Sequence, residues 1–238
     1  MKSYKLYHKQ LANYFHQLSR VNDKIEVFDV MMDFVLFRYR ENPRQEDLEK
    51  ITSKLGHQSS TNLLTEIEKV LSDFRRQMPM HDLLGEFYAL ECADKRAGQY
   101  FTPVDISDLQ AGLAVQDPNS CQIGQTVLDP ACGSGTLLLA VARRYRYFLF
   151  FGADLSERCC KMALYNLISN DLSGEICHLN SLTNEFFQAF IIAPGKSIDG
   201  SFRLFFINSY DKNDSIIHLK TKEEIKSVRQ SRKKKLSQ

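Results

Sequence analysis

The stretch Gln-Thr-Val-Leu-Asp-Pro-Ala-Cys-Gly-Ser-Gly-Thr, residues 125–136, gives the strongest indication of the fold class of this chain. Its apolar, β-prone start, Thr126–Leu128, is typical of the end of a buried strand. Gly133 and Gly135 predict a turn, because glycine tolerates positive φ and lets another molecule approach the backbone. The apolar residues 137–142 predict a helix after that turn. Together they indicate the first unit of a Rossmann-like sheet, whose ligands lie at the carboxyl ends of the strands.

A second apolar run, Tyr147–Phe151, predicts the neighbouring strand, and Asp154 follows at its tip. A carboxylate in this place can accept hydrogen bonds from the hydroxyls of a ribose. We therefore predict that Asp154 binds ribose. The alternative is that Asp154 only precedes the helix over 157–170, where acidic residues are favoured. Gly174 is expected to close that helix, and Glu175–Leu179 to form a third strand.

Two strings carry a resemblance to a known family: Asp-Pro-Ala-Cys-Gly-Ser-Gly at 129–135 and Gly-Gln-Tyr-Phe-Thr-Pro at 98–103. The first resembles the glycine motif of S-adenosylmethionine (SAM) dependent methyltransferases that act on exocyclic amines of bases. The pair looks most like the adenine-N6 DNA methylases, in particular the methylation subunit of type I restriction–modification systems. The string Asp82–Tyr88 is similar to a helix just upstream of the SAM domain in those subunits. The resemblance covers about residues 80–182.

The resemblance implies SAM as cofactor and a set of residues that bind it. These residues are Gln99, Tyr100, Phe101, Thr102, Pro103, Asp129, Ala131, Gly133, Ser134, Gly135, Thr136, Asp154 and Asn180. In the family, the position of Thr102 lies near the amino-acid part of SAM and that of Asn180 near its adenine. Leu179 stands where the family has glycine, and Asn180 is explained nearly as well by a turn at the end of a strand. An ordinary turn with two core aromatics is the alternative for 98–103.

One motif that the chemistry needs is missing from the sequence. The N6 amine of adenine is a poor nucleophile, and adenine-N6 methylases hold it with an [Asp or Asn]-Pro-Pro-[Tyr or Phe] motif. The chain contains no Pro-Pro. The nearest string is 205–210, which makes Asn208 and Tyr210 the catalytic candidates. The favoured alternative is a β-hairpin of Phe202–Tyr210 with Ser215–Lys220, which would place Asn208 inside a strand.

Residues 1–97 read as a helical segment without strand alternation. Apolar residues from Tyr7 to Leu18 recur on one helical face, and the helix over 24–39 is apolar except for one narrow stripe of acids, namely Glu26, Asp29 and Asp33. A further amphipathic helix is expected to begin at Ser60 or Thr61 as N-cap. We interpret the segment as a bundle that packs on a SAM-binding domain at 98–220, followed by a basic tail at 221–238.

Composition narrows the class of protein further. The chain has 238 residues, 43% of them hydrophobic, and a net charge of +2, which argues neither for nor against nucleic acid. Its six cysteines form no Cys-x-x-Cys pair and no secretion signal precedes them, so reduced thiols in the cytoplasm are expected. The apolar run Val30–Phe37 is too short to span a membrane. We see no metal-binding cluster and expect no metal.

The sequence thus predicts an α/β fold, a Rossmann-like SAM-dependent methyltransferase domain with a possibly incomplete sheet, preceded by helices. The function implied by the resemblance is methyl transfer from SAM to adenine-N6 in DNA. The alternative is a catalytically silent SAM-binding subunit, with a regulatory or assembly role, that needs a partner chain to supply target recognition or the missing motif.

Overall fold

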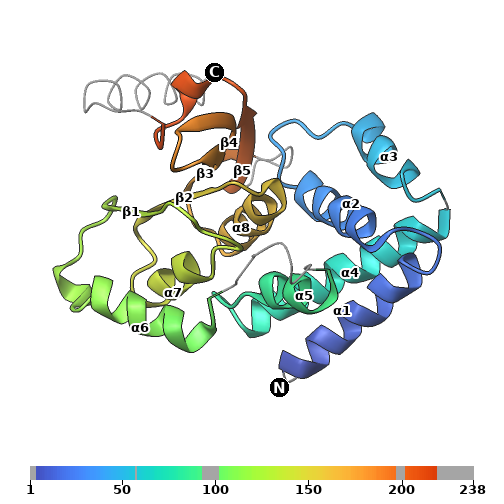
Figure 1. Cartoon of the computed structure of the whole chain (residues 1–238), viewed down its shortest axis with the longest axis horizontal. Coiled ribbons are helices and arrows are strands. Elements are labelled where there is room, and N and C mark those ends of the chain that lie inside the picture. The colour runs from blue at the N-terminus through green and yellow to red at the C-terminus, as the bar shows by residue number, and fades with distance from the viewer. Residues whose placement is uncertain (1–3, 57, 93–101, 197–201, 219–238) are drawn as a thin grey trace.

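The computed structural model describes residues 4–56, 58–92, 102–196 and 202–218, and these residues form a helical bundle beside a five-stranded sheet (Figure 1). The bundle consists of α1 (Tyr4–Leu18), α2 (Lys24–Phe37), α3 (Gln45–Ser53), α4 (Gln58–Gln77) and α5 (Leu83–Glu91). The helices that follow are α6 (Val104–Ala114), α7 (Thr136–Arg144) and α8 (Glu157–Ser169), with short 3-10 turns at η2 (Pro118–Ser120) and η3 (Lys212–Asp214). The strands are β1 (Thr126–Asp129), β2 (Leu149–Asp154), β3 (Gly174–Asn180), β4 (Glu185–Lys196) and β5 (Phe202–Ser209).

The sheet has the order β1-β2-β3-β4-β5. Strands β1, β2 and β3 are parallel, and the helices α7 and α8 make the two connections between them. Such strand–helix–strand units are the building block of doubly wound folds, so the predicted Rossmann-like α/β fold is confirmed. Strand β4 then turns back antiparallel to β3, and β5 is antiparallel to β4. The carboxyl end of β5 therefore lies at the same edge as those of β1–β3.

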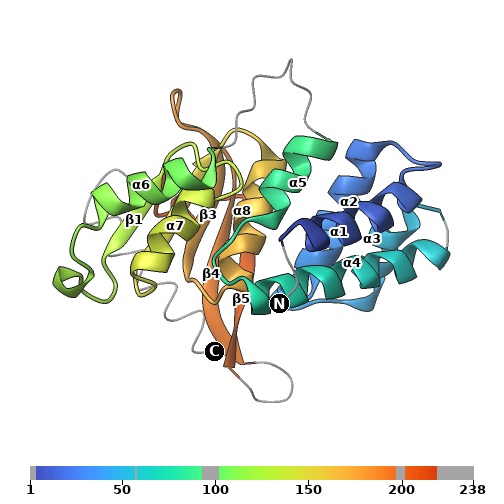
Figure 2. The same ribbon diagram turned by 90° about the horizontal axis from the view of Figure 1, so that it is seen from below.

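One hydrophobic core runs through both parts of the molecule. It joins fully buried side chains of the bundle, such as Tyr7, Phe28 and Phe87, to Phe150 and Phe206 in the sheet. Helix α8 lies between the sheet and α2, where it contacts β2 and β3 on one side and α2 on the other (Figure 2). The bundle thus covers one face of the sheet through α8, as its buried apolar stripes require.

The helix predictions agree closely with the structure except at two helix ends. The amphipathic face from Tyr7 to Leu18 forms α1, with Tyr7, Leu11, Phe15 and Leu18 buried. The prediction that Ser60 or Thr61 caps the fourth helix is wrong, because α4 already begins at Gln58. Ser60 is buried inside the first turn, and its hydroxyl donates to the carbonyl of Leu55 instead.

The prediction that Gly174 closes a helix is also wrong. Helix α8 ends at Ser169, and the chain reverses at Asp171, which has a φ of 58°. Gly174 is the first residue of β3 and lies against β2. A Cβ added to it would stand 1.7 Å from the carbonyl oxygen of Phe150, so glycine is needed for the two strands to approach each other.

The hairpin at the end of the domain has a different partner from the one predicted. Strand β5 pairs with β4, which precedes it, over Ala189–Lys196 and Phe202–Ser209. Within the described part, Ser215–His218 forms turns rather than a strand. The buried carboxylate of Glu175 accepts hydrogen bonds from the Ser215 hydroxyl and the Ile216 amide, which holds these turns against β3. Strand β4 is the partner instead, and its aromatic and branched side chains, such as Phe190 and Ile191, favour a strand at this place.

Candidate cofactor site

The glycine turn between β1 and α7 has the conformation that the sequence predicts. Gly133 and Gly135 have φ values of 53° and 85°, in the left-handed region that glycine adopts without strain. A Cβ on Gly135 would lie 3.3 Å from the Cα of Ala163, so the turn also packs tightly against α8. The Cys132 amide donates to the carbonyl of Ala153, which fixes the turn against the end of β2.

Two carboxylates from the strand ends lie at this turn. Asp154, at the tip of β2, accepts hydrogen bonds from the Gly133 amide at 2.9 Å and from the Ser156 amide at 2.8 Å. Asp129, at the end of β1, accepts one from the Ala131 amide at 3.1 Å. Burial raises the pKa of Asp129, and the nearby Asp154 carboxylate raises it further. Because each carboxylate oxygen can accept more than one hydrogen bond, Asp154 keeps capacity for a further donor.

The turn after β3 meets the same site. The Asn180 side-chain oxygen accepts hydrogen bonds from the amides of Leu182 at 3.0 Å and Thr183 at 3.2 Å, which is the arrangement of an Asx turn. The Ser181 hydroxyl donates to the carbonyl of Pro130 in the glycine turn. The structure therefore brings the carboxyl ends of β1, β2 and β3 together, and Asn180 has the turn role that was its alternative explanation.

A residue from the bundle, Asp82, completes the site from the other side. It is 5% exposed and caps the N-terminus of α5. One carboxylate oxygen accepts from the Gly85 amide and the Asn166 side chain, both at 2.8 Å. The other accepts from the hydroxyls of Ser134 and, at 2.7 Å, Thr136. The hydroxyls of two predicted cofactor-binding residues are thus directed at Asp82.

Sequence reasoning assigned no role to Asp82 or to Asn166. Asn166 lies on the buried face of α8 and is 4% exposed. Its side chain donates to Asp82 and, at 2.9 Å, to the carbonyl of Ser134. A polar residue on a buried face needs a hydrogen-bond partner, and that requirement was the signal that a network lies at this point.

A pocket of about 280 Å³ opens beside the network. It lies between α5 and the start of α6, and its lining includes Gly85, Glu86, Thr102, Pro103 and Thr136. Thr102 and Pro103 are therefore close to the glycine turn, as the family resemblance implies. The predicted ligands Gln99, Tyr100 and Phe101 lie outside the described residues.

The two catalytic candidates do not lie at the glycine turn. A row of paired residues crosses the sheet from Asp129 through Gly152, Ile176 and Phe190 to Asn208. Four strand spacings of about 4.8 Å separate its ends by about 19 Å.

Tyr210 follows β5 and is 75% exposed. With Asn208, Arg40 and Lys161 it lines a separate cavity of about 190 Å³ between α2, α8 and the hairpin. Neither candidate therefore meets the residues that surround the glycine turn.

The described residues give little support for a nucleophilic cysteine, a metal site or a membrane-spanning helix. The thiol of Cys132, inside the glycine turn, is 6% exposed, and burial raises its pKa well above the ordinary value, so it is a poor nucleophile. No group of three or more potential metal ligands occurs in the residues that the structure describes. Among the same residues, no helix is both long and apolar enough to cross a membrane.

A family model of N-6 DNA methylases matches residues 80–217 of the chain. The chain belongs to this family. The match begins just before Asp82 and extends past β5, so the glycine turn, the strand ends and the buried network all belong to the part shared with other N-6 DNA methylases. The family resemblance inferred from the strings at 98–103 and 129–135 is confirmed.

Curated relatives include methylase subunits of type I restriction enzymes. The MjaVII methylase subunit of Methanocaldococcus jannaschii is 24% identical over 187 residues, which cover 70% of this chain and 27% of the relative. The MpnII methylase subunit of Mycoplasma pneumoniae is 29% identical over 121 residues, or 46% and 22% of the two chains. The chain spans about a quarter of the length of these relatives. Among solved structures, the type I methyltransferase subunit of Streptococcus thermophilus superposes with a TM-score of 0.45 at 17% identity, covering 72% of this chain and 57% of that one.

Proposed function

We propose that the chain binds SAM at the glycine turn and is the cofactor-binding part of an adenine-N6 DNA methylase. The observation that carries this proposal is the meeting of three strand ends at the turn, within a chain of the N-6 DNA methylase family. When bound, SAM supplies a methyl group activated by a positively charged sulfur. The role of this chain is then to hold and orient that group.

The residues at the turn suit the parts of SAM. The left-handed glycines bring backbone close to a ligand without side chains in the way. The carboxylate of Asp154 retains capacity to accept from a ribose hydroxyl while it holds the Gly133 amide. Glu86, which lines the neighbouring pocket, offers a negative charge to the ammonium of an amino acid, and Thr102 lines the same pocket.

We propose further that the groups which accept the N6 amine come from outside the described residues. Among those residues β1 pairs only with β2, and Leu128 on β1 is 55% exposed. In a doubly wound sheet the first strand is central, with the ligand in the crevice where the strand order reverses. A further polypeptide segment beside β1 would occupy the other side of that crevice, next to the glycine turn. Asn208 and Tyr210 do not reach this place.

The test is a calorimetric titration of SAM into the wild type and into Asp154→Ala, with transfer of labelled methyl groups to mixed-sequence DNA measured in the same samples. Loss of the ribose contact and of the anchor for Gly133 should weaken SAM binding about tenfold or more. Asp47→Ala, on α3 and remote from the turn, is the matched control and should bind as the wild type does.

The outcomes separate the parts of the proposal. SAM binding that depends on Asp154, without methyl transfer to DNA, supports a cofactor-binding part that needs a further segment. Methyl transfer by the chain alone would show that the acceptor groups lie within the chain, and would contradict the need for a segment from any other chain. Absence of SAM binding in the wild type would overturn the proposed function.

A further inference from the structure

The glycine turn is held at both ends by carboxylates that come from different parts of the fold. At its beginning, Asp154 of β2 accepts the Gly133 amide at 2.9 Å. At its end, Asp82 of the bundle accepts the hydroxyls of Ser134 and Thr136. The first anchor belongs to the Rossmann-like unit itself, whereas the second lies 52 residues before Ser134 in sequence.

The residues around Asp82 form an extended hydrogen-bond network. The carboxylate is buried and receives donors from four elements, namely α5, the glycine turn, the start of α7 and α8. Asn166 bridges the network because its amide donates both to Asp82 and to the carbonyl of Ser134. The hydroxyls of Ser134 and Thr136 also lie 3.2 Å from each other. Such a network leaves the side chains little freedom.

The backbone of α5 is shaped for this contact. At Gly85, a Cβ would lie 2.2 Å from the Oδ2 of Asp82 and 2.3 Å from the Oγ of Ser134. Any other residue at this position would push the carboxylate and the turn apart. The hydroxyl of Tyr4 donates to the carbonyl of Asp82 at 3.0 Å, so α1 also holds the residue in place.

We propose that Asp82 is a positioning residue for the cofactor turn, so that the N-terminal helices are an obligatory part of the cofactor site. Through the hydroxyls of Ser134 and Thr136 it fixes the last part of the turn and the start of α7. These two hydroxyls therefore act as anchors for the backbone and not as ligands of the cofactor. The inference rests on the proposed function only in naming SAM as the ligand that the turn receives.

The experiment compares the wild type with Asp82→Asn and Thr136→Val in the full chain. Asp82→Asn keeps the size of the side chain but replaces one acceptor, and Thr136→Val removes one donor at constant shape. Glu175→Gln is the matched control, because Glu175 is also a buried carboxylate but holds the turns at 215–217 and not the glycine turn. The first readout is hydrogen exchange of the amides of 131–137, and the second is SAM affinity by calorimetry, measured well below the unfolding temperature of each variant.

The expected result is that Asp82→Asn and Thr136→Val each speed exchange in the turn and weaken SAM binding, by about tenfold for the charged acceptor. Glu175→Gln should lower thermal stability but change neither readout. If Asp82→Asn does not fold, Thr136→Val alone carries the test.

Two other results would overturn the positioning role and the proposed function separately. Unchanged exchange in the turn of both variants would overturn the positioning role, even if SAM affinity falls, because Asp82 and Thr136 would then act on SAM directly. No SAM binding by the wild type would overturn the proposed function, while the exchange measurement would still decide whether Asp82 positions the turn.

Discussion

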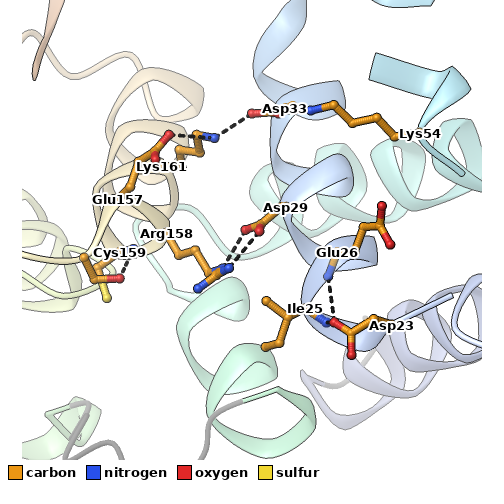
Figure 3. A network of polar contacts seen from close by, with 11 residues as sticks. Asp23, Ile25, Glu26, Asp29, Asp33, Lys54, Glu157, Arg158, Cys159 and Lys161 are labelled. Atoms are coloured by element: carbon orange, nitrogen blue, oxygen red, sulfur yellow. Dashed lines mark hydrogen bonds and ion pairs between the residues drawn. The ribbon is translucent and has the colours of Figure 1, made fainter. Parts of the chain in front are cut away.

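Two of the contacts that attach the helical bundle to the sheet domain are made by aspartates of the bundle. At the first, Asp82 is 5% exposed and is surrounded by neutral donors from α5, the glycine turn, the start of α7 and α8. At the second, Asp29 on α2 pairs with Arg158 on α8 through two hydrogen bonds of 2.6 and 2.8 Å, and Asp33 pairs with Lys161 at 2.8 Å (Figure 3).

The Asp29–Arg158 pair of the second attachment differs from Asp82 mainly in burial. The side chains of Asp29 and Arg158 remain 36% and 38% exposed, so water screens the attraction between them. The hydrogen bonds to Asp29 raise the pKa of the Arg158 guanidinium, which stays charged over the ordinary pH range. At Asp82, by contrast, any lost partner leaves a buried polar group without compensation. The same residue type should therefore matter much more at the first attachment than at the second.

The largest effect is expected from Gly85→Ala, which breaks the buried attachment by steric clash. The new methyl group would overlap the carboxylate of Asp82 and the side chain of Ser134. Displacing both from a packed network should cost about 3 kcal/mol of unfolding free energy. The measurement is unfolding in urea followed by circular dichroism.

Gly112→Ala is the matched control for that substitution. Gly112 lies within α6, and the nearest atom to its added Cβ would be 3.9 Å away. Because alanine favours helix over glycine, this variant should gain up to about 1 kcal/mol. Equal stability of the two variants would show that the space around Gly85 is not limiting.

A smaller effect, with a characteristic pH dependence, is expected from Asn166→Asp. It places a second carboxyl group against Asp82 in a buried site, at a cost of about 2 kcal/mol near neutral pH. Like charges raise the folded-state pKa of the pair above the unfolded value of about 4. Stability is therefore retained at low pH and lost as the pH rises through the folded-state pKa.

The check is urea unfolding of Asn166→Asp at a series of pH values between about 5 and 8, beside Asn166→Leu. The leucine variant removes the same donors without adding a charge, so its deficit relative to the wild type should not vary with pH. A deficit of Asn166→Asp that is equally independent of pH would mean that the two carboxyls do not share one site.

The comparison also shows what a sequence can reveal about such contacts. The acidic stripe of α2 was evident from the spacing of Glu26, Asp29 and Asp33, because helical periodicity is a local property. The partners on α8 were not, since pairing Asp29 with Arg158 joins residues 129 positions apart. The glycine turn and the position of Asp154 are likewise local, whereas the contact of Asp82 with Ser134 exists only once the core has formed.

The strands of the sheet also differ in how well they could be predicted from the sequence. Strands β1, β2 and β3 were predicted because each ends in a recognisable turn or motif. Strand β4 was not predicted, and Phe202–Tyr210 was expected to pair with Ser215–Lys220, whereas in the structure β5 pairs with β4. Asn208 lies far from the glycine turn because β5 pairs with β4. This distance could not be predicted from the spacing of residues in the sequence.

The smallest effect is expected at the exposed attachment, and it is best measured as a coupling between its two partners. A double-mutant cycle of Asp29→Asn and Arg158→Gln should give a coupling of about 1 kcal/mol or less, which decreases in about 1 M NaCl. Lys54→Gln is the control, because Lys54 lies 3.7 Å from Asp33 and is 53% exposed, so its loss should leave stability unchanged. A coupling at Asp29 and Arg158 as large as the effect of Gly85→Ala, and insensitive to salt, would mean that burial does not set the difference between the two attachments. The bundle would then be held by charge as much as by the network that reaches the glycine turn.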